Sequence, residues 1–127
     1  MKSALYIAAF LGLAIGLAHS WLGERYILIR LFRRSDLPKL FGGIEFTTRT
    51  LRFAWHITSI AWWGFAWLLL LLAHPPVSTK SVGLVAGVTF LATGAVILAG
   101  SRGKHLAWLV FAVMGVLTLY ATRASLG

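Results

Sequence analysis

The sequence of 127 residues has no cysteine and only three acidic residues. The absence of cysteine excludes disulfides, iron–sulfur clusters and thiolate metal sites, so a bound metal would depend on histidine or carboxylate ligands. The three acids, Glu24, Asp36 and Glu45, all lie between the first and second long apolar stretches. Transporters usually place ionisable groups near the centre of the membrane, and the lack of an acid there disfavours transport by a single copy.

Apolar residues, by contrast, make up 59% of the chain. The mean hydropathy is +0.84, which indicates more apolar surface than a soluble domain of this length can bury. A transmembrane helix needs about 20 predominantly apolar residues, and four stretches approach that length: residues 3–22, 53–73, 82–100 and 105–122. The sequence therefore predicts an all-α integral membrane protein, with one domain over residues 1–127 folded as a bundle of four transmembrane helices.

The longest connection, residues 23–52, is predicted to be a loop that contains one ordered segment. Residues 24–37 place apolar side chains such as Ile27 and Leu31 on one side of a helix and arginines on another. Such a segment lies flat among lipid headgroups or prolongs the first helix, and the sequence leaves both open. We expect a short amphipathic interfacial segment after the first helix, ending near Pro38.

Basic residues distinguish the two sides of the membrane. Of the 12 Lys and Arg, seven lie in residues 23–52 and two in the turn 101–104, against three on the other side, Lys2, Lys80 and Arg123. Basic loops stay in the cytoplasm, so we expect an inner (plasma) membrane protein with both termini outside the cytoplasm. The net charge of +9 favours anionic lipid headgroups as partners, and nucleic acid is not expected because no basic run is long enough to form a binding arm.

Small residues recur at every fourth position of the first helix: Ala4, Ala8, Gly12, Gly16 and Ser20. In lipid, close backbone approach supplies much of the energy of helix association, so this stripe is predicted to be a packing seam. Its partner is expected to be another helix of the same chain. A second copy in a homo-oligomer and a membrane partner subunit remain alternatives.

Three of the four histidines, His19, His56 and His105, are predicted to lie at a similar depth near the cytoplasmic face. Neutral imidazoles on facing helices can bind a haem iron from both sides, and interfacial arginines can pair with its propionates. The arginines placed for that role are Arg49, Arg52 and Arg102. These residues form the hypothesis of a cofactor site for haem b.

A metal ion is the competing hypothesis for the same histidines. Its ligands would be His19, His56 and His105 with a carboxylate, Glu24 or Glu45. Histidines near helix ends also occur without any ligand, bonded to lipid, water or backbone carbonyls. For Glu24 the ordinary alternative is an ion pair with one of three nearby arginines: Arg49, Arg52 and Arg102.

The function that follows from these patterns is broad. We expect a small multi-pass inner-membrane protein, without enzymatic activity or catalytic residues, that is a structural or interaction component of a membrane assembly. A haem-binding electron-transfer or quinone-linked membrane subunit using His19, His56 or His105 is one alternative. A small-molecule or ion transporter is the other.

Overall fold

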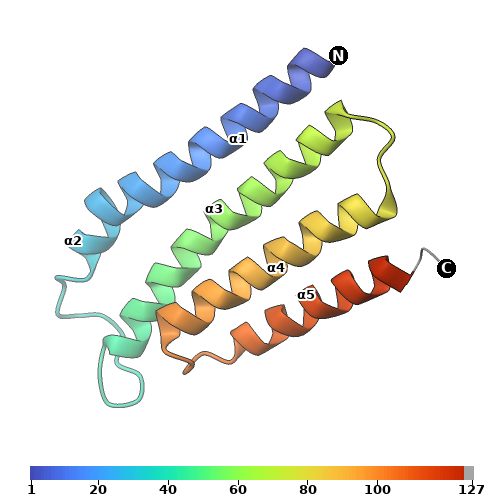
Figure 1. Cartoon of the computed structure of the whole chain (residues 1–127). Coiled ribbons are helices and arrows are strands. Elements are labelled where there is room, and N and C mark those ends of the chain that lie inside the picture. Colours follow the sequence, from blue (N-terminus) through green and yellow to red (C-terminus); the bar gives the residue numbers. More distant parts are fainter. Residues whose placement is uncertain (125–127) are drawn as a thin grey trace.

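The computed structural model describes residues 1–124, and that part of the chain contains helices and turns but no β-strand. Its long helices run antiparallel to their neighbours in chain order (Figure 1): α1 (Lys2–Leu22), α3 (Glu45–Ala73), α4 (Thr79–Ser101) and α5 (Ala107–Ala124). Three helices are long and apolar enough to cross a membrane: Lys2–Leu31, Glu45–Ala73 and Thr79–Ser101. A shorter apolar helix, Ala107–Arg123, follows them. The predicted all-α class is confirmed.

Local sequence signals set the limits of α4. The Ser78 hydroxyl accepts a hydrogen bond from the Ser81 backbone N–H at 3.0 Å, and the Ser81 hydroxyl accepts one from the Ser78 N–H at 3.1 Å. This reciprocal capping box satisfies two amides at the helix start. At the other end Arg102 and Gly103 adopt left-handed conformations, and the Gly103 N–H donates to the carbonyl of Leu98 at 2.9 Å. These bonds end α4 and begin the turn toward α5.

The end of α3 is tied to the start of α1. The helix ends at Ala73, before His74 and two prolines. His74 Nδ1 lies 2.8 Å from the carbonyl of Leu70, and its Nε2 lies 2.8 Å from the Tyr6 hydroxyl. Because a carbonyl only accepts, Nδ1 donates and Nε2 accepts from Tyr6. The fourth histidine, His74, therefore has a structural role, at the end of the helices opposite to the predicted site.

The segment after the first predicted helix does not form a separate interfacial helix. α1 continues through one π-helical stretch, η1 (Gly23–Leu28), into a last turn, α2 (Ile29–Leu31). The prolonged helix is held by packing against α3, since Leu28 is only 2% exposed. The expected ending near Pro38 and the expected loop over 23–52 are therefore corrected: residues 23–31 are helical, and α3 already begins at Glu45.

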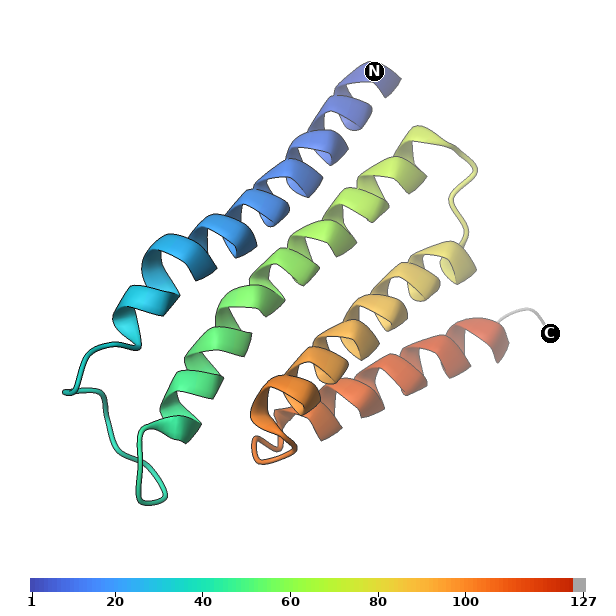
Figure 2. The same ribbon diagram turned by 60° about the vertical axis from the view of Figure 1, so that its left-hand side comes forward.

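The helices form an open row (Figures 1 and 2). Each long helix packs on its neighbour in sequence, and within residues 1–124 the backbone of α1 approaches neither α4 nor α5. The four-helix bundle expected from the sequence is therefore not confirmed, since the helices pack side by side in a row. The three seams each join helices that are consecutive in the chain: α1 with α3, α3 with α4, and α4 with α5.

Glycines permit close approach at these seams. A Cβ on Gly64 of α3 would lie 2.6 Å from the Thr89 hydroxyl of α4, and one on Gly87 would lie 2.6 Å from Leu119 of α5. In α1 the seam includes Gly12 and Gly16, as predicted, but Ala4 and Ala8 are exposed. Ala9, 1% exposed, takes their place. A strict four-residue spacing drifts around a helix of 3.6 residues per turn, so a stripe of five residues cannot stay on one seam.

Candidate functional site

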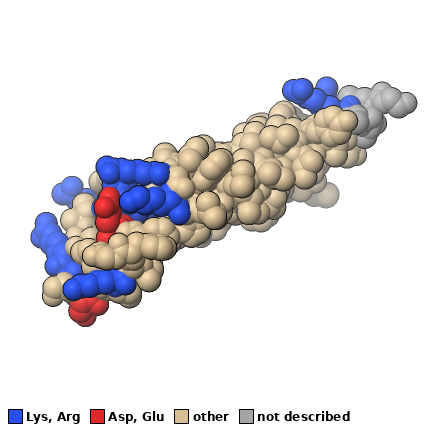
Figure 3. Space-filling model, turned by 90° about the horizontal axis from the view of Figure 1, so that it is seen from below, with Lys and Arg blue, Asp and Glu red and all other residues tan. Residues whose placement is uncertain are grey.

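Charged residues gather at one end of the molecule, where the loop 32–44 and the turn between α4 and α5 lie together. Figure 3 shows most Lys and Arg there beside the acids, and a smaller basic group at the opposite end. The three predicted histidines also lie in the half of the helices nearest this end. Side chains from different helices meet at this end.

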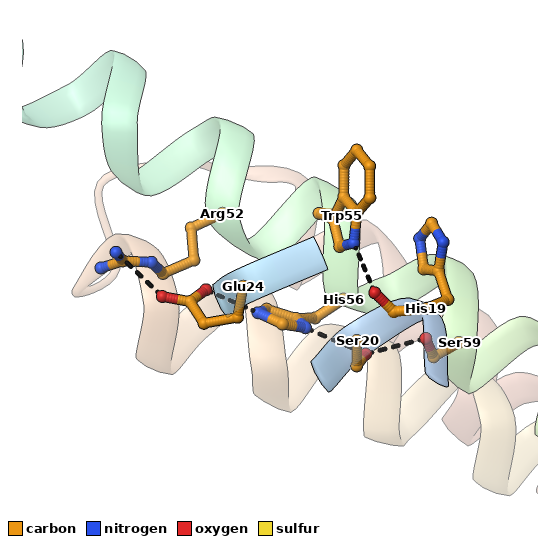
Figure 4. A network of polar contacts seen from close by, with 7 residues as sticks. All are labelled: His19, Ser20, Glu24, Arg52, Trp55, His56 and Ser59. Atoms are coloured by element: carbon orange, nitrogen blue, oxygen red, sulfur yellow. Dashed lines mark hydrogen bonds and ion pairs between the residues drawn. The ribbon is translucent and has the colours of Figure 1, made fainter. Parts of the chain in front are cut away.

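A continuous chain of polar contacts joins α3 to α1 and η1 (Figure 4). Arg52 and Glu24 form an ion pair at 3.1 Å, which confirms the predicted pairing of Glu24 with a nearby arginine. The other carboxylate oxygen of Glu24 lies 3.2 Å from His56 Nε2. His56 Nδ1 lies 3.0 Å from the Ser20 hydroxyl, which is 2.8 Å from the hydroxyl of Ser59. These five residues are called the Glu24–Ser59 network below.

The hydrogens available to this network can be counted. Four contacts need one hydrogen each: Glu24 to His56, His56 to Ser20, Ser20 to Ser59, and Ser59 to the carbonyl of Gly16. The two hydroxyls supply one each and a neutral imidazole supplies one more. A network with a neutral imidazole therefore has three hydrogens for its four contacts.

The same face of α3 also bonds directly to the backbone of α1. Three side chains spaced four residues apart donate to α1 carbonyls: Trp55 Nε1 to His19 at 3.0 Å, Ser59 Oγ to Gly16 at 2.8 Å, and Trp63 Nε1 to Leu13 at 3.2 Å. The glycines of α1 make these bonds feasible, because a Cβ on Gly16 would collide with the Trp63 ring and one on Gly23 with Trp55. These three hydrogen bonds are called the ladder below. The network and the ladder together hold α1 in contact with α3.

His19 lies beside the ladder with its ring stacked on Trp55. The ring centroids are 4.5 Å apart and the planes are parallel within 1°, and Trp62 approaches at 4.9 Å. Within the described part of the chain its buried Nε2 has no hydrogen-bond partner. The His19 side chain also borders a groove of about 270 Å³ between α1, η1 and Trp55. Of the predicted site residues, all within residues 1–124, His19 is thus the one with a buried side-chain nitrogen that has no partner.

His105 lies on a different side of α3. Its ring packs between Phe53, at 5.2 Å between centroids, and Phe46, at 5.9 Å. Its Nδ1 accepts a long 3.4 Å hydrogen bond from the N–H of Ala107 at the start of α5. This position caps α5 and fills space beside aromatic rings. It does not join His56, whose two ring nitrogens contact the network.

The predicted arginines divide in the same way. Arg52 belongs to the network beside α1, and its guanidinium also lies 4.9 Å from the centre of the Phe32 ring. Arg49 pairs with Glu45 at 2.9 Å and donates to the carbonyl of Gly100 at 3.3 Å, at the end of α4. Arg102 approaches the same carboxylate at 3.8 Å. The six residues predicted for a cofactor therefore form two groups, one on each side of α3.

Metal binding has little geometric support. Across residues 1–124 no group of three or more His, Cys, Asp and Glu side chains could hold a metal ion. Glu24 and His56 do meet, but each already has other partners in the network. The metal and haem hypotheses remain predictions, and the structure brings together fewer of their ligands than the sequence led us to expect.

The sequence placed Ser20 in the predicted packing seam, but it did not predict the contacts of Ser20 with Ser59 and His56. A signal for them exists: Ser20 lies four residues before Glu24, and Ser59 lies three after His56, so each pair shares a helix face. The order carboxylate, imidazole, hydroxyl resembles the arrangement of a hydrolase triad. The grooves along α1, however, are lined by other residues than Ser20, whose hydroxyl faces Ser59 inside the seam. This arrangement joins α3 to α1 through hydrogen bonds.

The polar side chains of this site thus bond α3 to α1. Comparisons of the chain with protein-family models, with curated proteins and with solved structures found no match in any of the three.

Proposed function

We propose that this chain is a small multi-pass protein of the inner membrane, with four crossings, that serves as a structural or interaction component of a membrane assembly. The observation that carries the proposal is the open row. Its outer helices, α1 and α5, each pack on one neighbour and expose large apolar side chains along the rest of their surface, among them Phe10, Leu17, Val113 and Val116. A row of this kind can be extended by a further helix at either edge.

The use of polar groups supports the same proposal. In the seam between α1 and α3, His56, Ser59 and Trp63 bond to another side chain or to backbone. Near the centre of α4, Thr89 and Thr93 donate to carbonyls of their own helix, at 2.7 and 2.8 Å. Such groups are already satisfied and are not available to a passing substrate. A scaffold role therefore fits better than transport.

We propose the orientation from the distribution of basic residues. Seven of the 12 Lys and Arg lie in 23–52 and two in 101–104. The loop before α3 and the turn between α4 and α5 lie at the same end of the row (Figure 1), and Figure 3 shows the larger basic group at one end of the molecule. The positive-inside rule then places this end in the cytoplasm and both termini outside. A single cysteine introduced at Ser78 should react with an impermeant reagent from outside, and one introduced at Ser35 should not. The reverse labelling pattern would overturn the orientation.

The assembly proposal is tested by photo-crosslinking in intact membranes. A photoreactive amino acid replaces Val113 or Val116, at the outer face of α5, and in a control it replaces Phe65 of α3, which is 65% exposed but lies away from both edges. We expect a defined protein adduct, with a second copy or another membrane protein, from the α5 positions and lipid adducts alone from position 65. Lipid adducts alone from all three positions would contradict the proposal.

One observation favours a second candidate function, a haem-binding membrane subunit. His19 has a buried ring nitrogen without a partner, beside a groove, and it could serve as an axial ligand. His56 is less suitable because both of its ring nitrogens are engaged. The test is an absorption spectrum of the purified protein. A Soret band that disappears on His19→Ala would establish haem, and a colourless preparation would exclude it.

A further inference from the structure

The chain makes a tight turn directly before α3 whose central residue is unexpected. Leu40 N–H donates to the carbonyl of Gly43 at 2.9 Å, and Gly43 N–H donates back to Leu40 at 3.2 Å. Between them, Phe41 and Gly42 have φ values of +52° and +87°. These are the features of a two-residue type I′ turn, in which asparagine or glycine adopts the left-handed conformation easily and a bulky side chain does not.

Folding alone does not account for the aromatic side chain at this position. Phe41 is 90% exposed, and its ring meets one other ring, the edge of Phe46 at 5.0 Å between centroids. The Phe41 side chain buries too little apolar surface to offset the strain of its backbone, so it does not stabilise the folded chain. Residues held in unfavourable conformations cluster at sites of binding, so the surroundings of Phe41 are a candidate binding site.

Phe41 forms one wall of a cavity of about 570 Å³. Leu40 and Phe46 add apolar surface, the backbone of Gly42 and Gly43 forms the floor of the turn, and Lys104 lines the cavity from the turn between α4 and α5. The cavity thus lies between two loops that are 60 residues apart in sequence. It combines an apolar wall with a cationic one, which is the combination that an amphiphilic anion requires.

The charge balance favours an anion. Within residues 1–124 the Lys104 ammonium forms no hydrogen bond or ion pair with a carboxylate. Glu45 also lines the cavity, but Arg49 holds its carboxylate at 2.9 Å and Arg102 approaches it at 3.8 Å. Three cations, Arg49, Arg102 and Lys104, therefore act on one acid, and Lys104 is the one of them that lines the cavity.

The cavity lies at the depth of lipid headgroups if the helices cross a membrane. Arg49 reaches the carbonyl of Gly100, near the end of the apolar helix α4, and Glu45 precedes Arg49 by one helical turn, about 5.4 Å. The headgroup layer on each side of the hydrocarbon is about 5–8 Å thick. Lys104 and the turn at Phe41 therefore face the layer in which phosphate groups lie.

We propose that this cavity binds the phosphate of an anionic phospholipid, with Lys104 as the cationic partner and Leu40 and Phe41 against the glycerol and the first carbons of the acyl chains. The proposal rests on the membrane insertion proposed above. It is more specific than a general attraction of basic residues to anionic lipid, because it assigns one site, one lysine and one aromatic side chain. Lys104 would bind the phosphate oxygens, and the phosphate would belong to a lipid and not to a free ion.

The test uses the full chain in micelles of a neutral detergent, with backbone amide NMR signals of Gly42, Gly43 and Lys104 as reporters. The probes are a short-chain phosphatidylglycerol, the phosphatidylcholine of the same chain length, and inorganic phosphate. We expect saturable shifts with phosphatidylglycerol alone. Lys104→Gln should weaken binding about five-fold, since one interfacial cation contributes roughly 1 kcal/mol. The matched control Lys80→Gln, at the opposite end, should leave the affinity unchanged.

A second variant separates binding from folding. Phe41→Asn introduces the residue that a type I′ turn prefers, so the folded state should survive with an unfolding midpoint at least as high as that of the parent, while the lipid affinity falls. Equal saturation by inorganic phosphate would overturn the lipid as source. Full affinity in Lys104→Gln or in Phe41→Asn would overturn the site. Failure of the membrane proposal is a distinct result, because the chain would then remain soluble without detergent.

Discussion

One methyl group added to Gly16 should separate α1 from α3. A Cβ there would lie 2.9 Å from Cδ1 of Trp63 and closer still to Nε1, so the indole must move. That movement breaks the hydrogen bond from Trp63 to the carbonyl of Leu13, and it disturbs the neighbouring bond from Ser59 to Gly16 itself. The sequence motif that contains Gly16 also contains Gly12, where a Cβ would lie 3.3 Å from the Cβ of Ala66. The two glycines therefore form a matched pair.

The expected costs differ in size. Overpacking a close contact costs about 1–3 kcal/mol, and one interhelical hydrogen bond in a membrane protein contributes about 0.6 kcal/mol on average. Gly16→Ala should thus lower the free energy of unfolding by about 2–3 kcal/mol. Gly12→Ala needs a shift of a few tenths of an ångström and should cost below about 1 kcal/mol.

The measurement is reversible unfolding in mixed micelles of a neutral detergent and dodecyl sulfate, followed by tryptophan fluorescence. Trp63→Leu provides the background that isolates the clash, because Gly16→Ala should cost much less once the indole is gone. Equal costs for the two glycine variants would refute the reasoning. So would an undiminished cost of Gly16→Ala in the Trp63→Leu background, since the indole would then not be the obstacle.

Three further predictions follow from the polar groups and the turn. His56→Phe should lower the free energy of unfolding by about 1–3 kcal/mol because it removes two contacts of the network, whereas His105→Phe should cost less than about 1 kcal/mol; similar losses for both would contradict the division of the histidines. Phe41→Asn should raise the free energy of unfolding by about 1 kcal/mol as the left-handed strain is relieved, and a decrease would show that the aromatic ring stabilises the turn. The hydrogen bond from Arg34 lowers the pKa of Asp36 from 3.8 to about 2, so the stabilisation from this exposed pair should be complete above about pH 4 and lost as the pH falls through 2. Carboxyl carbon NMR of Asp36 would measure the titration, and a pKa in the parent protein equal to that of the Arg34→Gln variant would disprove the effect of the arginine.

Much of the secondary structure was predictable because apolar composition and helix-ending signals act locally. Pro75 and Pro76 end α3, and the turn at Arg102 and Gly103 ends α4, close to the expected positions. The extension of α1 to Leu31 was left open by the sequence. It depends on the burial of Leu28 against α3, a contact between segments that no local pattern encodes.

The candidate site was predictable in part. The sequence placed His19, His56 and Glu24 at the correct end and expected an arginine beside Glu24, which the structure identifies as Arg52. It could not place His105 on the opposite side of α3, because equal depth in a membrane does not imply a shared face. The rotation of each helix about its own axis decides which side chains meet, and that rotation is set by contacts such as Trp55 on Gly23.

The open row also determines how the energy of the fold is divided. Since each long helix within residues 1–124 packs only on its neighbours in sequence, the stability is close to a sum of three pairwise terms, as in proteins built from stacked repeats. Most contacts are formed between consecutive segments, which is the condition for rapid assembly. Each helix can therefore dock on the preceding one as it leaves the ribosome, and the chain needs no late step in which its first and last helices find each other.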